Sequence, residues 1–509
     1  MDINLLFLHI KVMSILLVIL LYVALLVLIS FFTGRNNSND SYFLGNRQSP
    51  WYIIAIGMVG ASVSGVSFVS VPGWVQSTGF TYMQMVFGFF LGYIVVAKVL
   101  LPLYYKFSFV TIYTYLKNRF GIHTYKTGAS FFLLSKSISA AARLYIVVIV
   151  LKTFVFDSMT TLDVPFWAIT TGAMIIIGLY TFRTGIKTII WTDVLQTLIM
   201  VAALCLIIAE VVAQLHLPSF AAVVETISES EYSKMFVFDD WGSRQHFVKQ
   251  FFSGVFVTIV MTGLDQDMMQ KNLTCKTLKE SQRNMYTYGF MFIPFNLLFL
   301  GLGALMLIFA QQNQIALPQL SDEILPTLVA NGYFGQITIY LFAVGLIAAA
   351  LSSVDSAITS LSTSFYIDIL DNNPNEDSTA KHRQRTGIHV AFCVLFIFLI
   401  LLFKSFNNKS AIDAVYTIVS YTYGPLLGLF AFGLFTKRIV KDKFVPYIAV
   451  LSPVLIFLLD ISFNHFFNYK FGYELLMLNG FFTFAGIWIF SRRDEISFAQ
   501  PHTINKIEN

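Results

Sequence analysis

Apolar stretches long enough to cross a lipid bilayer recur along the whole 509-residue sequence. A helix rises about 1.5 Å per residue, so about 20 apolar residues span a hydrocarbon core of about 30 Å. We predict about thirteen such helices. Their ranges are 12–32, 50–76, 81–105, 126–155, 164–182, 188–215, 247–270, 285–311, 333–368, 386–404, 411–436, 444–463 and 472–491. The pattern predicts an all-α integral membrane protein.

The composition supports this class of protein. Hydrophobic residues make up 56% of the chain and charged residues only 12%, so the apolar surface exceeds what one soluble core could bury. The net charge of +5 could indicate a nucleic-acid partner, but Lys and Arg lie in short loops between the predicted helices, as is typical of membrane topology. We therefore predict a lipid bilayer as a partner and no nucleic acid.

Lys and Arg occupy every second loop of the predicted series. They are Arg35 and Arg47; Lys106, Lys117 and Arg119; Arg183 and Lys187; Lys271, Lys276, Lys279 and Arg283; Lys381, Arg383 and Arg385; Lys437, Arg438, Lys441 and Lys443; and Arg492 with Arg493. Positive loops face the cytoplasm. An odd number of helices then places the N-terminus outside and the C-terminus in the cytoplasm, in an inner or plasma membrane.

Two predicted helices contain residues that weaken a helix at membrane depth. The segment "GASVSGVSFVSVPG", at 60–73, holds four serines and three glycines, and "VTIVMTGLDQDMMQ" places Gly263, Asp265 and Asp267 near the end of an apolar run. A loosened backbone is tolerated there only where protein or a water-filled cavity covers it. Close helix packing through small residues is the simpler explanation for either segment alone. Together, the two segments favour two broken helices.

The two broken helices are second and seventh in the predicted series. An offset of five spans inverts orientation in the membrane, so the pattern predicts inverted repeats. The predicted divisions are 1–49, an extra N-terminal helix with a cytoplasmic loop; 50–215, the first five-helix repeat; 216–246, an extracellular loop; 247–436, the second repeat; and 437–509, two C-terminal helices with a cytoplasmic tail.

Charged residues inside predicted helices are candidates for function. A charge at a helix centre costs about 2.5 to 3.5 kcal/mol on insertion scales, and Asp193, Asp355 and Arg143 all lie within predicted spans. Positions 352, 355, 356 and 359 follow the spacing of three and four that lines one helix face, so Ser352, Asp355, Ser356 and Thr359 share that face. Such a face offers oxygen ligands, which suit hard cations.

The chain resembles the sodium:solute symporter family over about residues 45 to 440. The segments that carry the resemblance are "SVSGVSFVSVPG", "TYLKNRFG", "TGIKTIIWTDVLQ", "LDQDMMQKNLTCK", "AAALSSVDSAITSLSTSFYIDI" and "YGPLLGLFAFGLFTKR", in the family's order. The resemblance implies a LeuT-type bundle of two inverted five-helix repeats, with one extra helix before it and two after it. It also implies sodium-coupled import of a small solute by alternating access, with Na+ as the coupling ion and no enzymatic reaction.

The resemblance implies where cations bind. For the main sodium site it indicates three carbonyls and two hydroxyls, from Gly60, Val63, Ala349, Ser352 and Ser353. For a second cation site it indicates Asp193, Ser352, Asp355 and Ser356. Other members often carry a small hydroxyl residue at the position of Asp355, so sodium and a proton are both open as the second cation.

The resemblance also implies a solute site against the first broken helix. Its polar groups would be Ser62, Ser64, Ser67, Gln84, Arg143, Asp265 and Gln266, with Tyr421 or Tyr423 as a lid. The residue types are similar to those of the sialic-acid branch, in which an arginine binds the solute carboxylate. If Arg143 instead pairs with Asp265 or Asp267, a neutral sugar or polyol is the expected solute.

Two alternatives from the residues stay open. Asp193 and Asp355 could couple transport to protons instead of sodium. An intramembrane enzyme is the remote alternative, because the sequence shows no paired His, nucleophile elbow or metal motif. The sequence leaves the oligomeric state open.

Overall fold

The computed structural model describes residues 3–33, 39–107, 109–156, 164–181, 185–374, 376, 378–406 and 411–493. Arg35, Arg183 and the predicted tail beyond residue 493 lie outside the described residues. The described chain is almost entirely helical, and its one small sheet pairs β1 (Ile439–Val440) with β2 (Ser491–Arg492) in antiparallel register.

Helices occur at each of the predicted spans. They are α1 (Ile3–Thr33); α3 (Trp51–Ser62) with α4 (Gly65–Thr78); α5 (Tyr82–Val95), continued by η2 (Val96–Leu100) and α6 (Leu101–Phe107); α8 (Ile122–Leu151); α9 (Phe166–Thr181); α10 (Gly185–Gln214); α12 (Phe247–Thr258), continued by η5 (Ile259–Gly263) and α13 (Gln266–Asn272); α14 (Leu278–Gln312); α16 (Gln336–Ser364); α17 (Thr379–Phe406); α18 (Ala411–Thr422) with α19 (Gly424–Phe435); α20 (Val445–Phe467); and α21 (Leu475–Ile489).

By length and composition, seven helices of the described chain could cross a membrane alone, and three bent pairs could each do so as one span. The predicted spans at 12–32, 164–182 and 472–491 correspond to shorter apolar helices, so the predicted count of thirteen stays a prediction. Shorter elements connect the long helices, among them α2 (Asn39–Leu44), α7 (Thr114–Arg119), α11 (Phe220–Glu229) and α15 (Ile324–Ala330).

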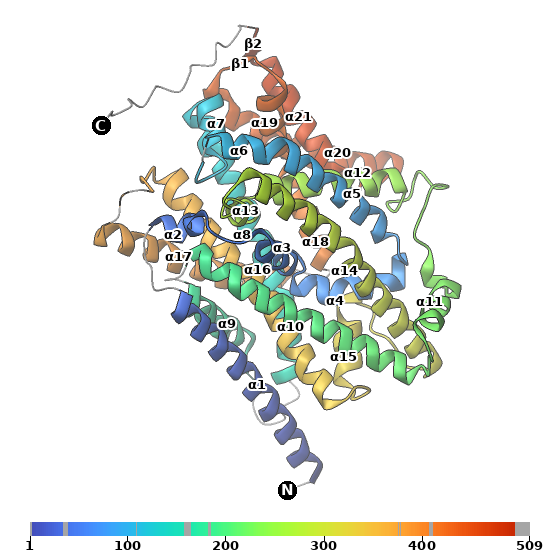
Figure 1. The fold of residues 1–509 in the computed structure, drawn as a ribbon. Coiled ribbons are helices and arrows are strands. Elements are labelled where there is room, and N and C mark those ends of the chain that lie inside the picture. The colour runs from blue at the N-terminus through green and yellow to red at the C-terminus, as the bar shows by residue number, and fades with distance from the viewer. Residues whose placement is uncertain are drawn as a thin grey trace.

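The long helices separate into a central group and a margin. Figure 1 shows α3, α8, α13 and α16 near the middle of the bundle, with α1, α11 and α20 at its edge. In its most apolar window, 83% of α16 is buried, against 22% for α20. The exposed side chains of α20 include Tyr447, Val450 and Phe466. A helix buried on all sides positions groups for chemistry, whereas an exposed apolar helix is suited to contact with lipid.

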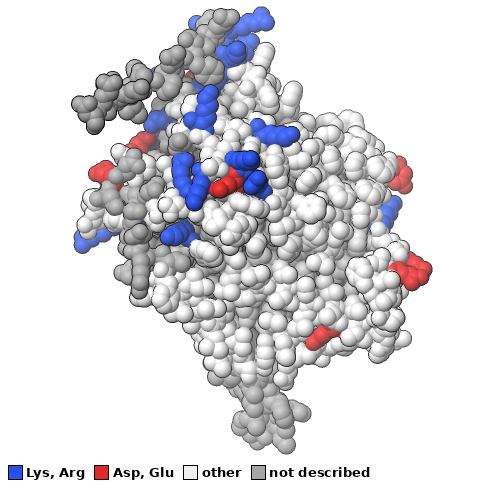
Figure 2. Space-filling view, viewed as in Figure 1, with Lys and Arg blue, Asp and Glu red and all other residues white. Residues whose placement is uncertain are grey.

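Charge is distributed unevenly over the surface. Figure 2 shows Lys and Arg gathered at one end of the visible face, around α7 and the β1–β2 pair, with a broad uncharged region below. A wide band without charge is what the hydrocarbon core requires of a protein surface.

Three of the spans are bent. The axes of α3 and α4 meet at 60°, those of α12 with η5 and α13 at 68°, and those of α18 and α19 at 46°. The first two bends fall where Gly and Ser, or Gly and Asp, predict them. The third is absent from the sequence-based expectation. It precedes Pro425, whose ring fixes φ and removes an N–H, so that proline starts a new helix more readily than it continues one.

The packing of α5 against α12 predicts that glycine is required in this interface. A Cβ atom on Gly254 would overlap the carbonyl oxygen of Met85, and one on Gly88 would overlap that of Phe251. Gly254→Ala should therefore lower the free energy of unfolding by about 1–3 kcal/mol, the usual cost of overpacking. The measurement is the apparent melting temperature of the purified protein in detergent.

Gly172→Ala is the matched control. A Cβ atom there meets none of the described atoms within 4 Å, and alanine favours a helix by up to about 1 kcal/mol over glycine. Its melting temperature should equal or exceed that of the wild type. Equal melting temperatures for the two variants would show that the α5–α12 contact can relax without cost.

Candidate solute and cation sites

The first break exposes backbone carbonyls at the centre of the bundle. Val63 and Ser64 leave the helical conformation, and the last turn of α3 closes with the Val63 N–H donating to the Val59 carbonyl at 2.8 Å. The carbonyls that follow in this turn lose their helical partners, as at any helix C-terminus. The Ser353 hydroxyl of α16 donates to the Ala61 carbonyl at 3.3 Å and to the Ala349 carbonyl at 3.1 Å.

The neighbouring helix α10 fits closely against this break. A Cβ atom on Gly60 would overlap the Thr197 hydroxyl, so glycine permits the approach of α3 to α10. Thr197 donates to the Ile56 carbonyl at 3.1 Å and to the Asp193 carbonyl at 2.6 Å. The first break is therefore enclosed by protein on the sides of α10 and α16.

The second break differs from the first because tyrosine hydroxyls donate hydrogen bonds to its backbone carbonyls. The Tyr104 hydroxyl donates to the Gly263 carbonyl and the Tyr113 hydroxyl to the Leu264 carbonyl, each at 2.9 Å. The Asp265 side chain caps α13 by accepting from the backbone N–H groups of Asp267 and Met268. This arrangement satisfies the interrupted backbone from within the protein, as a break in the membrane requires.

Of the predicted main sodium site, the structure places Ser353 against the last turn of α3. Ser353 of α16 donates to the Ala61 carbonyl, which lies between the predicted ligands Gly60 and Val63, and to the Ala349 carbonyl of its own helix. Ser352 is one residue from Ser353, but its hydroxyl donates to the Asp193 carboxylate at 2.6 Å. Ser353 thus joins α16 to the end of α3, and the neighbouring Ser352 joins α16 to Asp193 of α10.

Three of the residues predicted for a second cation site each contact a different side chain of the protein. Asp193 forms an ion pair with Lys271 of α13, with 2.8 Å between the carboxylate oxygen and Nζ. The Asp355 carboxylate accepts from the Tyr180 hydroxyl at 2.8 Å. The Ser356 hydroxyl donates to Asp267.

Lys271 was not predicted as part of any site. From the sequence it belongs to a cytoplasmic loop, yet its side chain is 1% exposed and also lies 4.0 Å from Asp267. The signal in the sequence is its spacing of four residues from Asp267, which places both charges on one face of a helix.

Lys136 of α8 joins the two carboxylates of α13. Its Nζ atom lies 3.1 Å from Asp265 and 2.8 Å from Asp267. Asp265 also accepts a hydrogen bond from Tyr423 at 2.7 Å. The prediction from the sequence missed Lys136, although it lies seven residues before Arg143 and hence on the same face of α8.

A polar cavity lies against the first break. The space open to the centres of water-sized molecules is about 80 Å³. Its lining comes from α3, α4, α5, α8, α12, η5, α13, α14 and α18, and includes Ser62, Ser64, Ser67, Phe89, Tyr93, Lys136, Arg143, Thr258, Thr262, Asp267, Tyr288 and Tyr416.

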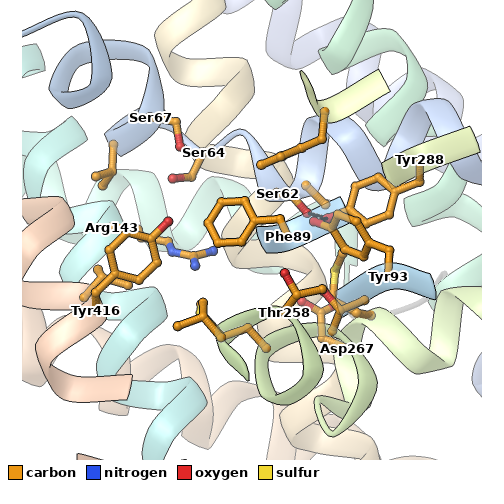
Figure 3. A pocket seen from close by; sticks show the side chains of 18 of the residues that line it. Ser62, Ser64, Ser67, Phe89, Tyr93, Arg143, Thr258, Asp267, Tyr288 and Tyr416 are labelled. Carbon is orange, nitrogen blue, oxygen red and sulfur yellow. Dashed lines mark hydrogen bonds between the residues drawn. The ribbon is translucent and has the colours of Figure 1, made fainter. Parts of the chain in front are cut away.

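Arg143 points into this cavity. Figure 3 shows its guanidinium between the rings of Phe89 and Tyr416, with Ser64 and Ser67 above it. Among the described residues, no carboxylate lies within 4.0 Å of the guanidinium, and the nearby acids of α13 pair with Lys136 instead.

The other residues predicted to bind solute have contacts outside the cavity lining. Gln84 donates to the Gln245 carbonyl at 2.8 Å and accepts from the Val237 N–H at 3.1 Å, so it holds the segment 216–246. Gln266 holds the turn before α7 through Val110 and Ile112, at 3.0 Å each.

The two predicted lid tyrosines and Asp265 also have partners elsewhere. Tyr421 donates to Asp460 of α20 at 3.2 Å. Tyr423 and Asp265 bond to each other, and neither is among the residues that line the cavity.

A second cavity lies beyond the first on the side of the 216–246 segment. Tyr82 lines this outer cavity together with Arg244, Asp413 and Tyr473. The Tyr82 hydroxyl bonds at 3.0 Å to that of Tyr416, which lines the inner cavity. One tyrosine pair therefore lies between the two cavities.

Two broken spans, a polar cavity against one break and buried ion pairs around the other define a secondary transporter of the inverted-repeat class. The chain belongs to the sodium:solute symporter family, whose model matches residues 42–442.

The comparisons with individual proteins agree. The sodium/sialic acid symporter SiaT of Proteus mirabilis is 23% identical over 432 residues, which cover 82% of this chain and 84% of the relative. The sodium/sialic acid symporter NanT of Aliivibrio fischeri is 23% identical over 473 residues, or 89% of each chain. A solved structure of a sodium-coupled sialic acid symporter, substrate-bound and outward-open, aligns with a TM-score of 0.79 and 19% identity over 93% of this chain and 97% of that one.

Several expectations are thereby confirmed. The fold is the LeuT-type bundle, and the protein is a multi-pass membrane protein. It is a transporter and not an enzyme, and it couples solute transport to Na+ by symport.

The ion cluster on α13 generates a stability prediction. Lys136→Met would leave Asp265 buried without its cation and Asp267 with only Lys271 at 4.0 Å, and removal of one partner of a buried pair costs about 3–5 kcal/mol. We expect a sharp fall in the yield of monodisperse protein and in its melting temperature, with partial rescue by Lys136→Arg, which keeps the charge.

Lys279→Met is the control, because Lys279 is exposed. It removes the same charge and should leave both readouts unchanged. A Lys136→Met protein as stable as the wild type would mean that other groups neutralise the two carboxylates.

Proposed function

We propose that the solute carries a carboxylate and that Arg143 binds it. An arginine at membrane depth is retained only with a partner, and the sequence left two: a solute anion, or the acids of α13. Lys136 holds both acids at 2.8–3.1 Å. The guanidinium, directed into the cavity with no described carboxylate within 4.0 Å, is the observation that supports an anionic solute.

The chemistry around Arg143 favours an acidic sugar over a simple acid. A planar guanidinium can bind a carboxylate through two parallel hydrogen bonds. Ser64 and Ser67 add hydroxyls above the guanidinium, which suit the hydroxyls of a sugar (Figure 3), and Ser62 lines the same cavity with its hydroxyl bonded to Tyr288. The names of the two relatives also indicate a sialic-acid-like substrate. A neutral sugar or polyol is the alternative.

The main sodium site is proposed at the first break. Gly60, Val63 and Ala349 would supply carbonyls, and Ser352 and Ser353 hydroxyls. In support, tyrosine hydroxyls donate to two carbonyls of the second break, whereas at the first break Ser353 of α16 donates to the Ala61 carbonyl, between Gly60 and Val63. Oxygen ligands of this kind suit a hard cation. Coupling to a proton through Asp355, which Tyr180 hydrogen-bonds, is the alternative for a second cation.

The proposed topology has the N-terminus outside and the C-terminus in the cytoplasm. The start of α1 lies at the opposite end of the molecule from β2, and Lys and Arg gather at the β2 end. This distribution supports a cytoplasmic β2 end. The proposed repeats are residues 50–215 and 247–436, each beginning with a broken helix.

The anionic-solute proposal predicts the effect of Arg143→Lys. Lysine keeps the charge but cannot form the paired hydrogen bonds, so solute binding should weaken at least tenfold, about 1.4 kcal/mol. Sodium-dependent thermal stabilisation should be retained. The measurement is how strongly acidic and neutral sugars inhibit uptake of the solute into vesicles with a sodium gradient.

The exposed Arg283→Lys is the matched control and should transport normally. The proposal fails if neutral polyols compete in the wild type where acidic sugars do not. It also fails if Arg143→Lys impairs folding and leaves the solute affinity of the folded fraction unchanged.

The sodium proposal predicts the effect of Ser353→Ala. Loss of one hydroxyl ligand should weaken sodium affinity about tenfold, or about 1.4 kcal/mol, while Ser352 keeps its bond to Asp193. The measurement is uptake against external sodium, replaced by choline at constant pH, and the exposed Ser462→Ala is the control. An unchanged sodium dependence would exclude Ser353 as a ligand, and uptake that persists in choline would favour protons.

A further inference from the structure

We infer that the ammonium group of Lys271 is the permanent occupant of the second cation site, so that the protein binds one sodium ion per transport cycle. The inference rests on the proposed main sodium site at the first break, which supplies that one ion. It concerns only the residues around Asp193.

The geometry places Lys271 where a second cation would bind. Its Nζ atom lies 2.8 Å from Asp193, and the Ser352 hydroxyl donates to the other oxygen of the same carboxylate at 2.6 Å. The side chains of Asp193 and Lys271 are 0% and 1% exposed. Both oxygens of the carboxylate thus have partners from the protein itself, one from α13 and one from α16.

The remaining predicted ligands of a second cation have other partners. Asp355 accepts from Tyr180 at 2.8 Å, and its other carboxylate oxygen accepts from the Ser356 N–H at 2.5 Å. The Ser356 hydroxyl donates to Asp267. A sodium ion beside Asp193 would therefore need both the departure of the ammonium and the rearrangement of these groups.

Charge explains why the two cations exclude each other. The ammonium and sodium carry the same single positive charge, and like charges at one buried carboxylate repel strongly at low dielectric. The ammonium is attached to α13, so its local concentration beside Asp193 is high, whereas sodium must bind from solution. The Lys271 ammonium therefore outcompetes sodium for the Asp193 carboxylate.

The test counts the sodium ions bound by the purified full-length chain in lipid nanodiscs. Equilibrium binding of radioactive sodium, with choline as the replacement salt, gives the number per chain. The wild type should bind one. Lys271→Ala leaves the Asp193 carboxylate, with Ser352 still bonded to it, without its cation and opens space for an ion, so the number should rise to two.

A neutral double variant provides the complementary measurement. Lys271→Met with Asp193→Asn removes the cation and the carboxylate together, and the number should stay at one, because neither residue holds sodium in the wild type. The exposed Lys279→Ala is the control for loss of a lysine and should also bind one.

Three results would overturn the inference. The most direct is a wild type that binds two sodium ions, and the other two concern the variants. One is a folded Lys271→Ala protein that still binds one ion, and the other is a double variant that binds fewer ions than the wild type. If Lys271→Ala does not fold, the wild type and the double variant decide: one ion for each supports the inference, and a loss between them overturns it.

The measurement is independent of the solute, because sodium is the only probe. A wrong assignment of Arg143 would change the competition by sugars and leave these numbers as they are. A wrong assignment of the main site would appear as an unchanged sodium curve for Ser353→Ala.

Discussion

A lipid bilayer offers no water to an interrupted helix, so every loosened carbonyl and N–H must find a partner in the protein or in a bound ligand. The two core breaks meet this requirement in different ways. At the second, the Tyr104 and Tyr113 hydroxyls and the Asp265 cap satisfy the backbone. At the first, Ser353 donates to the Ala61 carbonyl, and Ala61, Ser62 and Ser64 line the polar cavity. A fixed break and a break suited to a transported cation thus share one bundle.

Buried charge is organised by the same requirement for partners. Lys136 and Lys271 neutralise the acids on α10 and α13, and tyrosine and serine hydroxyls occupy the remaining oxygens. Arg143 is different, because its guanidinium faces the cavity and the described acids are engaged elsewhere. Because Lys136 pairs with both Asp265 and Asp267, the proposal of a solute-binding Arg143 is favoured over a structural ion pair with these acids.

Hydropathy located the spans because the bilayer imposes one length on all of them, and Gly, Ser and Asp within apolar runs located two of the three bends. The third bend was missed although Gly424 and Pro425 mark it. The direction of a buried polar side chain was harder to predict. Gln84 and Gln266 are of a residue type that is typical of solute sites. In the structure, however, their side-chain amides donate hydrogen bonds to backbone carbonyls of loops. Residue type reveals that a partner exists, and only packing reveals which one.

The ion pair between Lys271 and Asp193 has a consequence for the energy of uptake. A cation attached to the chain returns with the protein in each cycle, so it adds nothing to the net charge transferred. One sodium ion entering with a monoanionic solute then makes the coupled step electroneutral. A tenfold sodium gradient would concentrate the solute about tenfold, at about 1.4 kcal/mol. A second ion would add about 1.4 kcal/mol from the same gradient and about 2.3 kcal/mol for each 100 mV of membrane potential. With Lys271 in the second cation site, the largest solute concentration ratio that the protein can maintain would thus be lower. In return, this ratio would not change when the membrane depolarises.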